Sequence, residues 1–353
     1  MGIDFTAWFN SYLGGRQQVV VANDTMSEPS TVNCGVPQGN IIGSLLFLSY
    51  VNDMPISIKC KLLLYADDSA LMVPGLDPKV IAEILSNELK SCRQWLIDNK
   101  LSLHLGKTES ILFGTKHKLD KVNSFEVKCN NEIIINVKSV KYLGVQLDED
   151  LAGSSIVSDL IRKVNNRLKF LYRFKDLLNF DSRKILCTAL IQCHFDYSCS
   201  SWFPGINEAL KTKLNIMQNK MIRFILNLDN RAHIGNQERH KAGFLSVSER
   251  VRQLNLGHVF KIKNKSCPKY MASNFKLKSE MNTRNITRAT AHDFFVPGVA
   301  SPADKTFFYT AINDWNTLPV CIKESKNENQ FKEKVNHKLI DGAKKEEMNP
   351  FTK

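Results

Sequence analysis

The sequence predicts an α+β fold, an antiparallel sheet with helices, followed by a basic helical extension. Residues 16–147 mix strand-like and helix-like runs, as a layer of helices on a sheet would. From about Ser158 the apolar residues recur at helical spacing, and basic side chains crowd the other faces. The last region, residues 271–353, has a less regular pattern of apolar residues. We therefore expect domains at 1–147, 148–270 and 271–353.

The net charge of +13 is concentrated in the helical extension. Residues 1–150 carry −3, residues 151–270 carry +13 and residues 271–353 carry +3. A basic segment of this size is typical of a nucleic-acid partner, although an inert solvated surface would give the same count.

The composition limits the class of protein. With 353 residues, 43% hydrophobic and 24% charged, the chain can form two or three globular cores. No stretch approaches the roughly 20 apolar residues of a membrane span, and the start lacks the basic region of a signal peptide, so no membrane partner is expected. The nine cysteines are widely spaced without a CxxC pair. This indicates reduced thiols in an intracellular protein, in the nucleus or the cytoplasm.

The first elements are expected in this order. Residues 5–13 have apolar side chains at helical spacing, and Gly14 and Gly15 end that helix. The segment QQVVVAN is typical of a strand. The apolar run from Asn40 to Val51 is longer than most strands, so it predicts a buried helix.

A hairpin is expected at residues 61–73, and further elements follow it. Asp77 is expected to cap a core-covering helix that begins at Pro78. FEVKCNNEIIINV predicts a hairpin that turns at Asn130 and Asn131, and VKYLGVQL predicts one more strand.

The extension predicts three helices. The first has an apolar stripe made of Leu160, Ile161, Val164, Leu168 and Leu171. Asp181 is expected to cap a second helix that runs through Leu190, and a third is expected from about Asn207 to Leu228. Beyond them lies an apolar cluster formed by Phe307, Phe308, Trp315 and Leu318. The tail GAKKEEMNPFTK lacks apolar content and is expected to be disordered.

The feature most suggestive of chemistry is a pair of adjacent acids, Asp67 and Asp68, where the two apolar runs of KLLLYADDSALMV meet at a turn. Adjacent carboxylates repel each other, and a hard divalent cation such as Mg²⁺ relieves the repulsion. Asp is also a common turn residue, so on the dipeptide alone a plain turn is clearly the favoured interpretation.

The context of the acids favours chemistry. The segment GVPQGNIIGSLLFLSYVNDMP, followed by LLLYADDSALM, resembles motifs B and C of reverse transcriptases, most closely those of non-LTR (LINE-type) retrotransposons. WLIDNKLSLHLGKTESILF resembles motif D, with His104 where Asn is expected, and Tyr142 to Val145 resemble motif E. HFDYSCSSW, QNKMIRFIL and FFYTAINDWNTLP resemble the downstream region of the same elements.

The resemblance implies a partial right-hand polymerase palm and a role for each motif. Asp67 and Asp68 would be ligands of Mg²⁺, two ions in the intact family site. Lys107 could protonate or neutralise the leaving pyrophosphate, or be an ordinary surface lysine. Tyr142, Leu143 and Gly144 would support the primer end, or the segment could be a plain core strand. A further set would line the template and incoming-nucleotide site: Gly35, Gln38 and Gly39. The implied partners are an RNA template, a DNA primer and deoxynucleoside triphosphates.

The sequence departs from the family pattern in one respect. The family's motif A supplies another catalytic aspartate, and the chain begins in a segment that resembles the connection after it. Asp4 has no apolar strand before it and does not fit that role. The expectation is therefore an RNA-directed DNA polymerase segment with impaired catalysis. The alternatives are an inert nucleic-acid-binding remnant and a host-recruited interaction protein, whose protein partners would be unknown.

Overall fold

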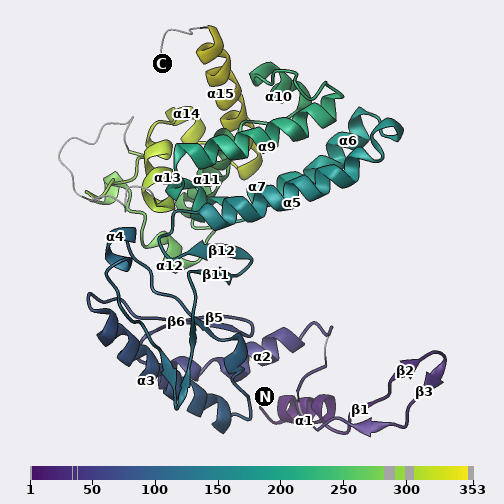
Figure 1. Ribbon diagram of the computed structural model, residues 1–353, viewed down its shortest axis with the longest axis vertical. Helices are drawn as coiled ribbons and strands as arrows, with labels where there is room; N and C mark the ends of the chain where they lie inside the picture. The colour runs from purple at the N-terminus through teal and green to yellow at the C-terminus, as the bar shows by residue number, and fades with distance from the viewer. Residues whose placement is uncertain (1, 34, 38, 282–290, 299–305, 349–353) are drawn as a thin grey trace. The chain divides into compact units, whose positions relative to one another are not determined.

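The computed structural model describes residues 2–33, 35–37, 39–281, 291–298 and 306–348 (Figure 1). The chain divides into two compact units. The first comprises Met1–Leu112 and Asp120–Val137, and the second comprises Phe113–Leu119 and Lys138–Lys353. The division falls ten residues before the boundary expected after residue 147, because residues 138–147 pack with the helices of the second unit.

The first unit combines helices with short two-stranded sheets. Its helices are α1 (Gly2–Leu13), α2 (Gly43–Val51) and α3 (Pro78–Asp98). The antiparallel pairs are β1 (Gln17–Gln18) with β4 (Ser30–Thr31), β2 (Val21–Ala22) with β3 (Thr25–Met26), β5 (Lys61–Tyr65) with β6 (Asp68–Met72), and β8 (Lys128–Cys129) with β9 (Glu132–Ile133). β7 (Glu109–Ser110) and β10 (Ile135–Asn136) pair in parallel. The mixed helix and short antiparallel sheet confirm the α+β class and are compatible with part of a reverse transcriptase fold.

Helix α3 organises the core of this unit. Asp77 caps it by accepting a hydrogen bond from the Lys79 amide, as the sequence predicted. Its buried stripe enters two apolar clusters. Ile81 and Leu89 pack in the cluster that contains β8, and Trp95 packs in the cluster that contains the end of α2. The helix thereby supports the β5–β6 hairpin, whose Leu71 is packed against both clusters.

The expected buried helix at residues 40–51 is only half correct. A helix forms from Gly43 to Val51, but it is far from buried on all sides. Val51 is 6% exposed, whereas Leu45 is 62% exposed and Ile41, just before the helix, is 96% exposed. An apolar run shows that a segment can be buried, while the neighbours it meets decide how much of it is.

The second unit is mainly helical. It begins with the hairpin β11 (Ser139–Tyr142) and β12 (Val145–Asp148). The main helices are α5 (Ser154–Tyr172), α6 (Phe180–Cys187), α9 (Glu208–Leu226), α11 (Val247–Lys263), α13 (Phe307–Asn316) and α15 (Glu328–Met348). Short helices lie between them: α4 (Lys116–Leu119), α7 (Cys193–Asp196), α8 (Cys199–Trp202), α10 (Asn236–Ala242), α12 (Lys269–Ala272) and α14 (Val320–Lys323).

Two apolar cores hold this unit together, and α11 contributes to both. Val251 packs in the core formed by β12, α5 and α9, and Phe260 packs in the core formed by α13 and α15. The predicted α5 stripe is confirmed, with Val164 fully buried, and Trp315 of the predicted carboxyl-terminal cluster is fully buried. Within the described ranges, no helix has the length and apolar character needed to cross a membrane.

Three local expectations in this unit were wrong. VKYLGVQL is not one strand but the β11–β12 hairpin, because Leu143 and Gly144 adopt the left-handed conformation of a tight turn. Asn179, rather than Asp181, caps α6 by accepting from the Ser182 amide, and the helix changes to a π-helical turn after Cys187. The tail expected to be disordered is helical over 342–348, where alanine, lysine and glutamate favour helix; residues 349–353 lie outside the described residues.

Candidate active site

The acid pair lies at the tip of the β5–β6 hairpin. The strands are in register from Lys61 opposite Met72 to Tyr65 opposite Asp68, which leaves Ala66 and Asp67 as a two-residue turn. Ala66 has a φ of 52°, a left-handed conformation that costs a residue other than glycine roughly 1–2 kcal/mol. The hairpin therefore holds its tip in a strained turn, which is a common feature of functional sites.

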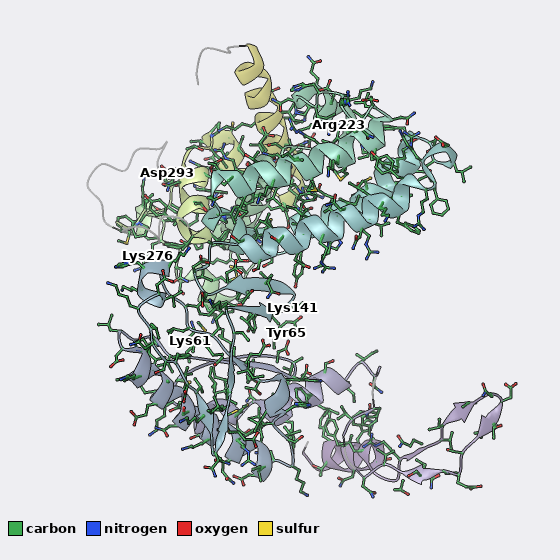
Figure 2. All side chains as sticks on the ribbon, in the orientation of Figure 1. Lys61, Tyr65, Lys141, Arg223, Lys276 and Asp293 are labelled. Carbon is green, nitrogen blue, oxygen red and sulfur yellow. The ribbon has the colours of Figure 1, made fainter. Side chains whose placement is uncertain are left out.

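Both carboxylates at this tip are open to solvent. Asp67 and Asp68 are exposed, and the described residues offer neither side chain a hydrogen bond or an ion pair. Figure 2 labels Lys61 and Tyr65, the first and last residues of β5. Since no lysine or arginine of the described chain neutralises the two acids, they remain available to an external cation.

The pair is not part of a larger cluster of metal-binding side chains in the described ranges, where no group of three or more His, Cys, Asp or Glu could hold an ion. Two adjacent carboxylates supply the hard oxygen donors that Mg²⁺ prefers, but Mg²⁺ usually keeps several waters or takes further oxygens. The donor set therefore fits a divalent cation and supplies only part of its coordination.

The glycine loop of the GVPQG motif has an open backbone. Gly35 and Gly39 have φ values of 73° and 76°, and a Cβ atom added to either would meet no atom within 4 Å. These glycines leave space above the loop for a ligand to approach the backbone. Gln38, the expected hydrogen-bonding side chain, lies outside the described residues.

Arg16 ties this loop to the end of α1, a contact that the sequence patterns did not predict. Its Nη2 donates to the Gly35 carbonyl oxygen at 2.7 Å, and its Nε donates to the Leu13 carbonyl oxygen at 2.9 Å. In the part of the chain that the structure describes, no hydrogen bond joins the loop to the β5–β6 hairpin. The arginine directly after Gly14-Gly15 was a signal that could have been used, since it stands where a helix end leaves carbonyl groups unpaired.

The remaining expected residues lie in separate places. Lys107 ends a short 3-10 helix, Leu105–Lys107, in the first unit, and it is exposed. Tyr142 is half-buried at the end of β11, and Leu143 and Gly144 form the β11–β12 turn in the second unit. Their suggested roles in catalysis and primer support stay predictions.

A basic groove lies between α5 and α9, which run side by side in Figure 1. The hollow has a volume of about 360 Å³. Three cations border it: Lys169 from α5, and Lys220 and Arg223 from α9 (Figure 2 labels Arg223). Its other lining residues are Asn165, Leu168, Tyr172 and Asn230.

The electrostatics of the basic groove suit an anion. No described residue that lines it is acidic. The Arg223 Nε donates to the Ala232 carbonyl oxygen at 2.8 Å, which orients the guanidinium. Burial raises the pKa of Tyr172, an effect that the nearby positive charge of Arg223 opposes. A cation-lined hollow with amide donors provides the groups that contact phosphate oxygens in nucleic-acid complexes.

Comparison with known proteins shows what the first part of the chain is similar to. Residues 1–147 match the family described as reverse transcriptase (RNA-dependent DNA polymerase). The chain is 24% identical over 223 residues to the probable RNA-directed DNA polymerase from transposon X-element of Drosophila melanogaster. It is 24% identical over 226 residues to the RNA-directed DNA polymerase from mobile element jockey of Drosophila funebris, and 26% identical over 231 residues to the probable polymerase from transposon BS of Drosophila melanogaster.

These findings confirm that the chain is related to the reverse transcriptases of LINE-type, non-LTR retrotransposons, as its motifs indicated. Each alignment covers 61% of this chain, and the chain spans about a quarter of the length of the curated relatives it matches. Members of the reverse transcriptase family generally use divalent metal ions.

Proposed function

We propose that this chain contributes to an RNA-directed DNA polymerase that acts on an RNA template, a DNA primer and deoxynucleoside triphosphates. In this proposal residues 1–147 form the rear part of a polymerase palm, and the helical region binds the nucleic acid. The observation that carries the proposal is the acid pair: Asp67 and Asp68 lie exposed and without a described protein partner at the tip of a strained hairpin, in a segment that matches the reverse transcriptase family.

Asp67 and Asp68 would hold Mg²⁺, with Asp67 as the principal ligand. In such a site two ions activate the 3′-hydroxyl of the primer and stabilise the leaving pyrophosphate. The chain's own contribution is to keep two negative charges together at one tip. The β5–β6 ladder fixes their register, and α3 supports the hairpin from the core.

Other residues would each contact one of the substrates. Gly35 and Gly39 would let a template base or a nucleotide approach the loop backbone, with Gln38 as the hydrogen-bonding side chain. Lys107 would neutralise charge on the pyrophosphate. The β11–β12 turn at Leu143 and Gly144 would support the primer end.

A two-metal centre needs ligands from two sides, and the described ranges supply no third acid to this pair. The proposal therefore expects slow extension by residues 1–353 alone. An additional carboxylate should be needed for the full rate, since a metal ion contributes several kcal/mol to the transition state.

Primer extension on a primed RNA template tests the proposal. The Mg²⁺-dependent rate of the Asp67→Asn variant should fall at least about a thousandfold. Asp120→Asn is the matched control, because Asp120 is an exposed acid of the same unit. Extension that survives Asp67→Asn, or that Asp120→Asn reduces equally, would refute the assignment.

Binding of Mn²⁺ tests the same site without requiring turnover. Paramagnetic Mn²⁺ should broaden the amide resonances around Asp67 in the whole chain, and the double variant Asp67→Asn with Asp68→Asn should abolish this. Broadening that is equally strong in the variant would place the cation elsewhere.

The basic groove favours a second candidate, a nucleic-acid-binding remnant without chemistry. This candidate predicts salt-dependent binding that does not change in Asp67→Asn. Replacing both Lys169 and Lys220 with glutamine should reduce the slope of log affinity against log salt by about 2 for duplex DNA. The charge-matched control replaces the exposed Lys241 and Lys265. Binding with no extension under any condition would favour the remnant.

A further inference from the structure

A tyrosine from outside the β11–β12 hairpin holds the turn of that hairpin. The Tyr197 hydroxyl donates to the Leu143 carbonyl oxygen, with 2.6 Å between the two oxygen atoms. The tyrosine ring lies against the next residue, since a Cβ atom built on Gly144 would be 3.4 Å from Cε1 and Oη of Tyr197. The contact joins residues 54 positions apart in the chain.

The turn has a conformation that benefits from such a contact. Leu143 has a φ of 46° and Gly144 a φ of 82°, so both central residues of the turn are left-handed. Glycine adopts this conformation freely, but leucine does so at a cost. A hydrogen bond to the Leu143 carbonyl favours this peptide orientation over alternatives that relax the leucine.

Tyr197 is itself placed by a network of buried and half-buried groups. It directly follows α7, whose last residue, Asp196, accepts from Arg250 at 2.7 Å and from the side chain of Gln192 at 2.7 Å. The indole Nε1 of Trp202 donates to the Tyr197 carbonyl oxygen at 3.2 Å. The backbone on both sides of Tyr197 is therefore fixed.

A π-helical turn contributes to the same placement. It covers Thr188–Gln192, between α6 and α7. A π-helical turn adds a residue to the helix and rotates everything after it, and such turns are frequent at functional sites. The rotation sets which face of the segment Tyr197 occupies.

Tyr197 does not have the environment of a core residue. Its side chain is 56% exposed, whereas Phe195 and Cys199, two positions away on each side, are both 2% exposed. Burial of the ring therefore does not explain this position as it explains its neighbours. The specific interaction that remains is the hydroxyl on the turn.

We propose that Tyr197 is a positioning residue that fixes the Leu143–Gly144 turn so that its backbone can support the 3′ end of a primer. The inference rests on the proposed function, which places the primer end at this turn. The same core contains Val145 of β12 and Trp202, so the turn and the residue that holds it belong to one packed body.

Hydrogen exchange tests the structural half of the proposal. In the whole chain, Tyr197→Phe should raise amide exchange of the β11–β12 hairpin, around Tyr142 and Val145, by about fivefold, the effect of losing one hydrogen bond. Tyr270→Phe is the control, because Tyr270 is 74% exposed in the same unit. Unchanged exchange in Tyr197→Phe, or an equal rise in Tyr270→Phe, overturns the proposal.

Binding of primer ends tests the functional half. Fluorescence anisotropy compares a template–primer with a recessed 3′ end against a blunt duplex of the same length. Tyr197→Phe should reduce the preference for the recessed end several-fold and leave affinity for the blunt duplex unchanged. Equal loss for both duplexes, or no loss, contradicts a role at the primer end.

The two measurements separate failure of this inference from failure of the proposed function. If the unmodified chain shows no preference for a recessed end, the primer-support role fails for the chain as a whole, and the primer half of the inference fails with it. Hydrogen exchange still decides whether Tyr197 holds the turn.

Discussion

The two hairpins that carry the proposed chemistry both turn through two residues, but the turns differ in conformation and in use. The β5–β6 hairpin turns at Ala66 and Asp67, and the β11–β12 hairpin turns at Leu143 and Gly144. Each contains a residue other than glycine with positive φ, 52° at Ala66 and 46° at Leu143. The first tip presents acids without a described partner, whereas the second is bonded by Tyr197.

This difference shows how a two-residue hairpin turn can serve two purposes. A tip whose polar side chains have no partner in the described protein can bind an external ligand, here a cation. A tip that the protein satisfies itself is fixed before any ligand arrives, and it suits a surface that supports another molecule. Both turns contain a strained residue other than glycine. The two hairpins therefore differ in whether another part of the protein bonds to the tip.

The largest effect expected from this comparison is at Asp68. Asp68→Asn should lower Mg²⁺-dependent primer extension at least about a hundredfold, equivalent to about 3 kcal/mol in the barrier. The free energy of unfolding should stay within about 0.5 kcal/mol or rise, because the exchange relieves repulsion between adjacent acids. Urea unfolding beside the extension assay checks both. A clear loss of stability would mean that the protein uses the acid structurally.

The second hairpin should depend on the network behind Tyr197. Asp196→Ala removes the partner of Arg250 and should lower the free energy of unfolding by about 2 kcal/mol, since a half-buried charged hydrogen bond is lost. It should also speed hydrogen exchange in the β11–β12 hairpin. Asp181 is an exposed acid that does not cap a helix. Asp181→Ala should therefore change the free energy of unfolding and the hydrogen exchange of the hairpin far less. Similar effects of the two variants would show that the network is not specific.

Relief of turn strain should produce a smaller gain at the open tip. Ala66→Gly should raise the free energy of unfolding by about 0.5–1 kcal/mol, because glycine accepts the φ of 52° without steric cost. Leu143→Gly tests the equivalent position of the other hairpin. Chemical denaturation of both variants measures the gain. A loss of stability at Ala66 would indicate that the methyl group packs usefully in the turn.

The smallest effect concerns pH at the second hairpin. His194 lines a small hollow with Gly144 and Tyr197, and burial, helped by the charges of Lys163 and Arg167, lowers its pKa from 6.5. The unfolded chain therefore binds a proton at higher pH than the folded chain does. Stability should rise as the pH increases toward 6.5, and be reduced on the acid side.

Thermal unfolding across this range, with and without His194→Gln, measures that contribution. The variant should have a shallower dependence on pH than the unmodified chain. Burial also lowers the pKa of His258. His258 should therefore preserve part of the pH dependence of stability in the variant. A slope that His194→Gln leaves unchanged would assign the whole effect to other groups.

Patterns local in the sequence predicted many of the elements well. The Asp77 cap and α3, the β5–β6 hairpin with its acids at the turn, and α5 with its buried stripe all form where expected. The β11–β12 hairpin was missed because valine, tyrosine and leucine on both sides of Gly144 are all typical of a strand. A single glycine did not reveal that the chain reverses there.

The sequence by itself determined the family resemblance, the acid pair and the concentration of positive charge in the helical region, because each of these is a property of neighbouring residues. Tertiary structure alone decided that α2 keeps an exposed face, that Arg16 holds the Gly35 loop and that Tyr197 reaches the Leu143 carbonyl. The physical reason is distance along the chain. Contacts between residues 19 and 54 positions apart depend on how whole elements pack, and no local pattern encodes that packing.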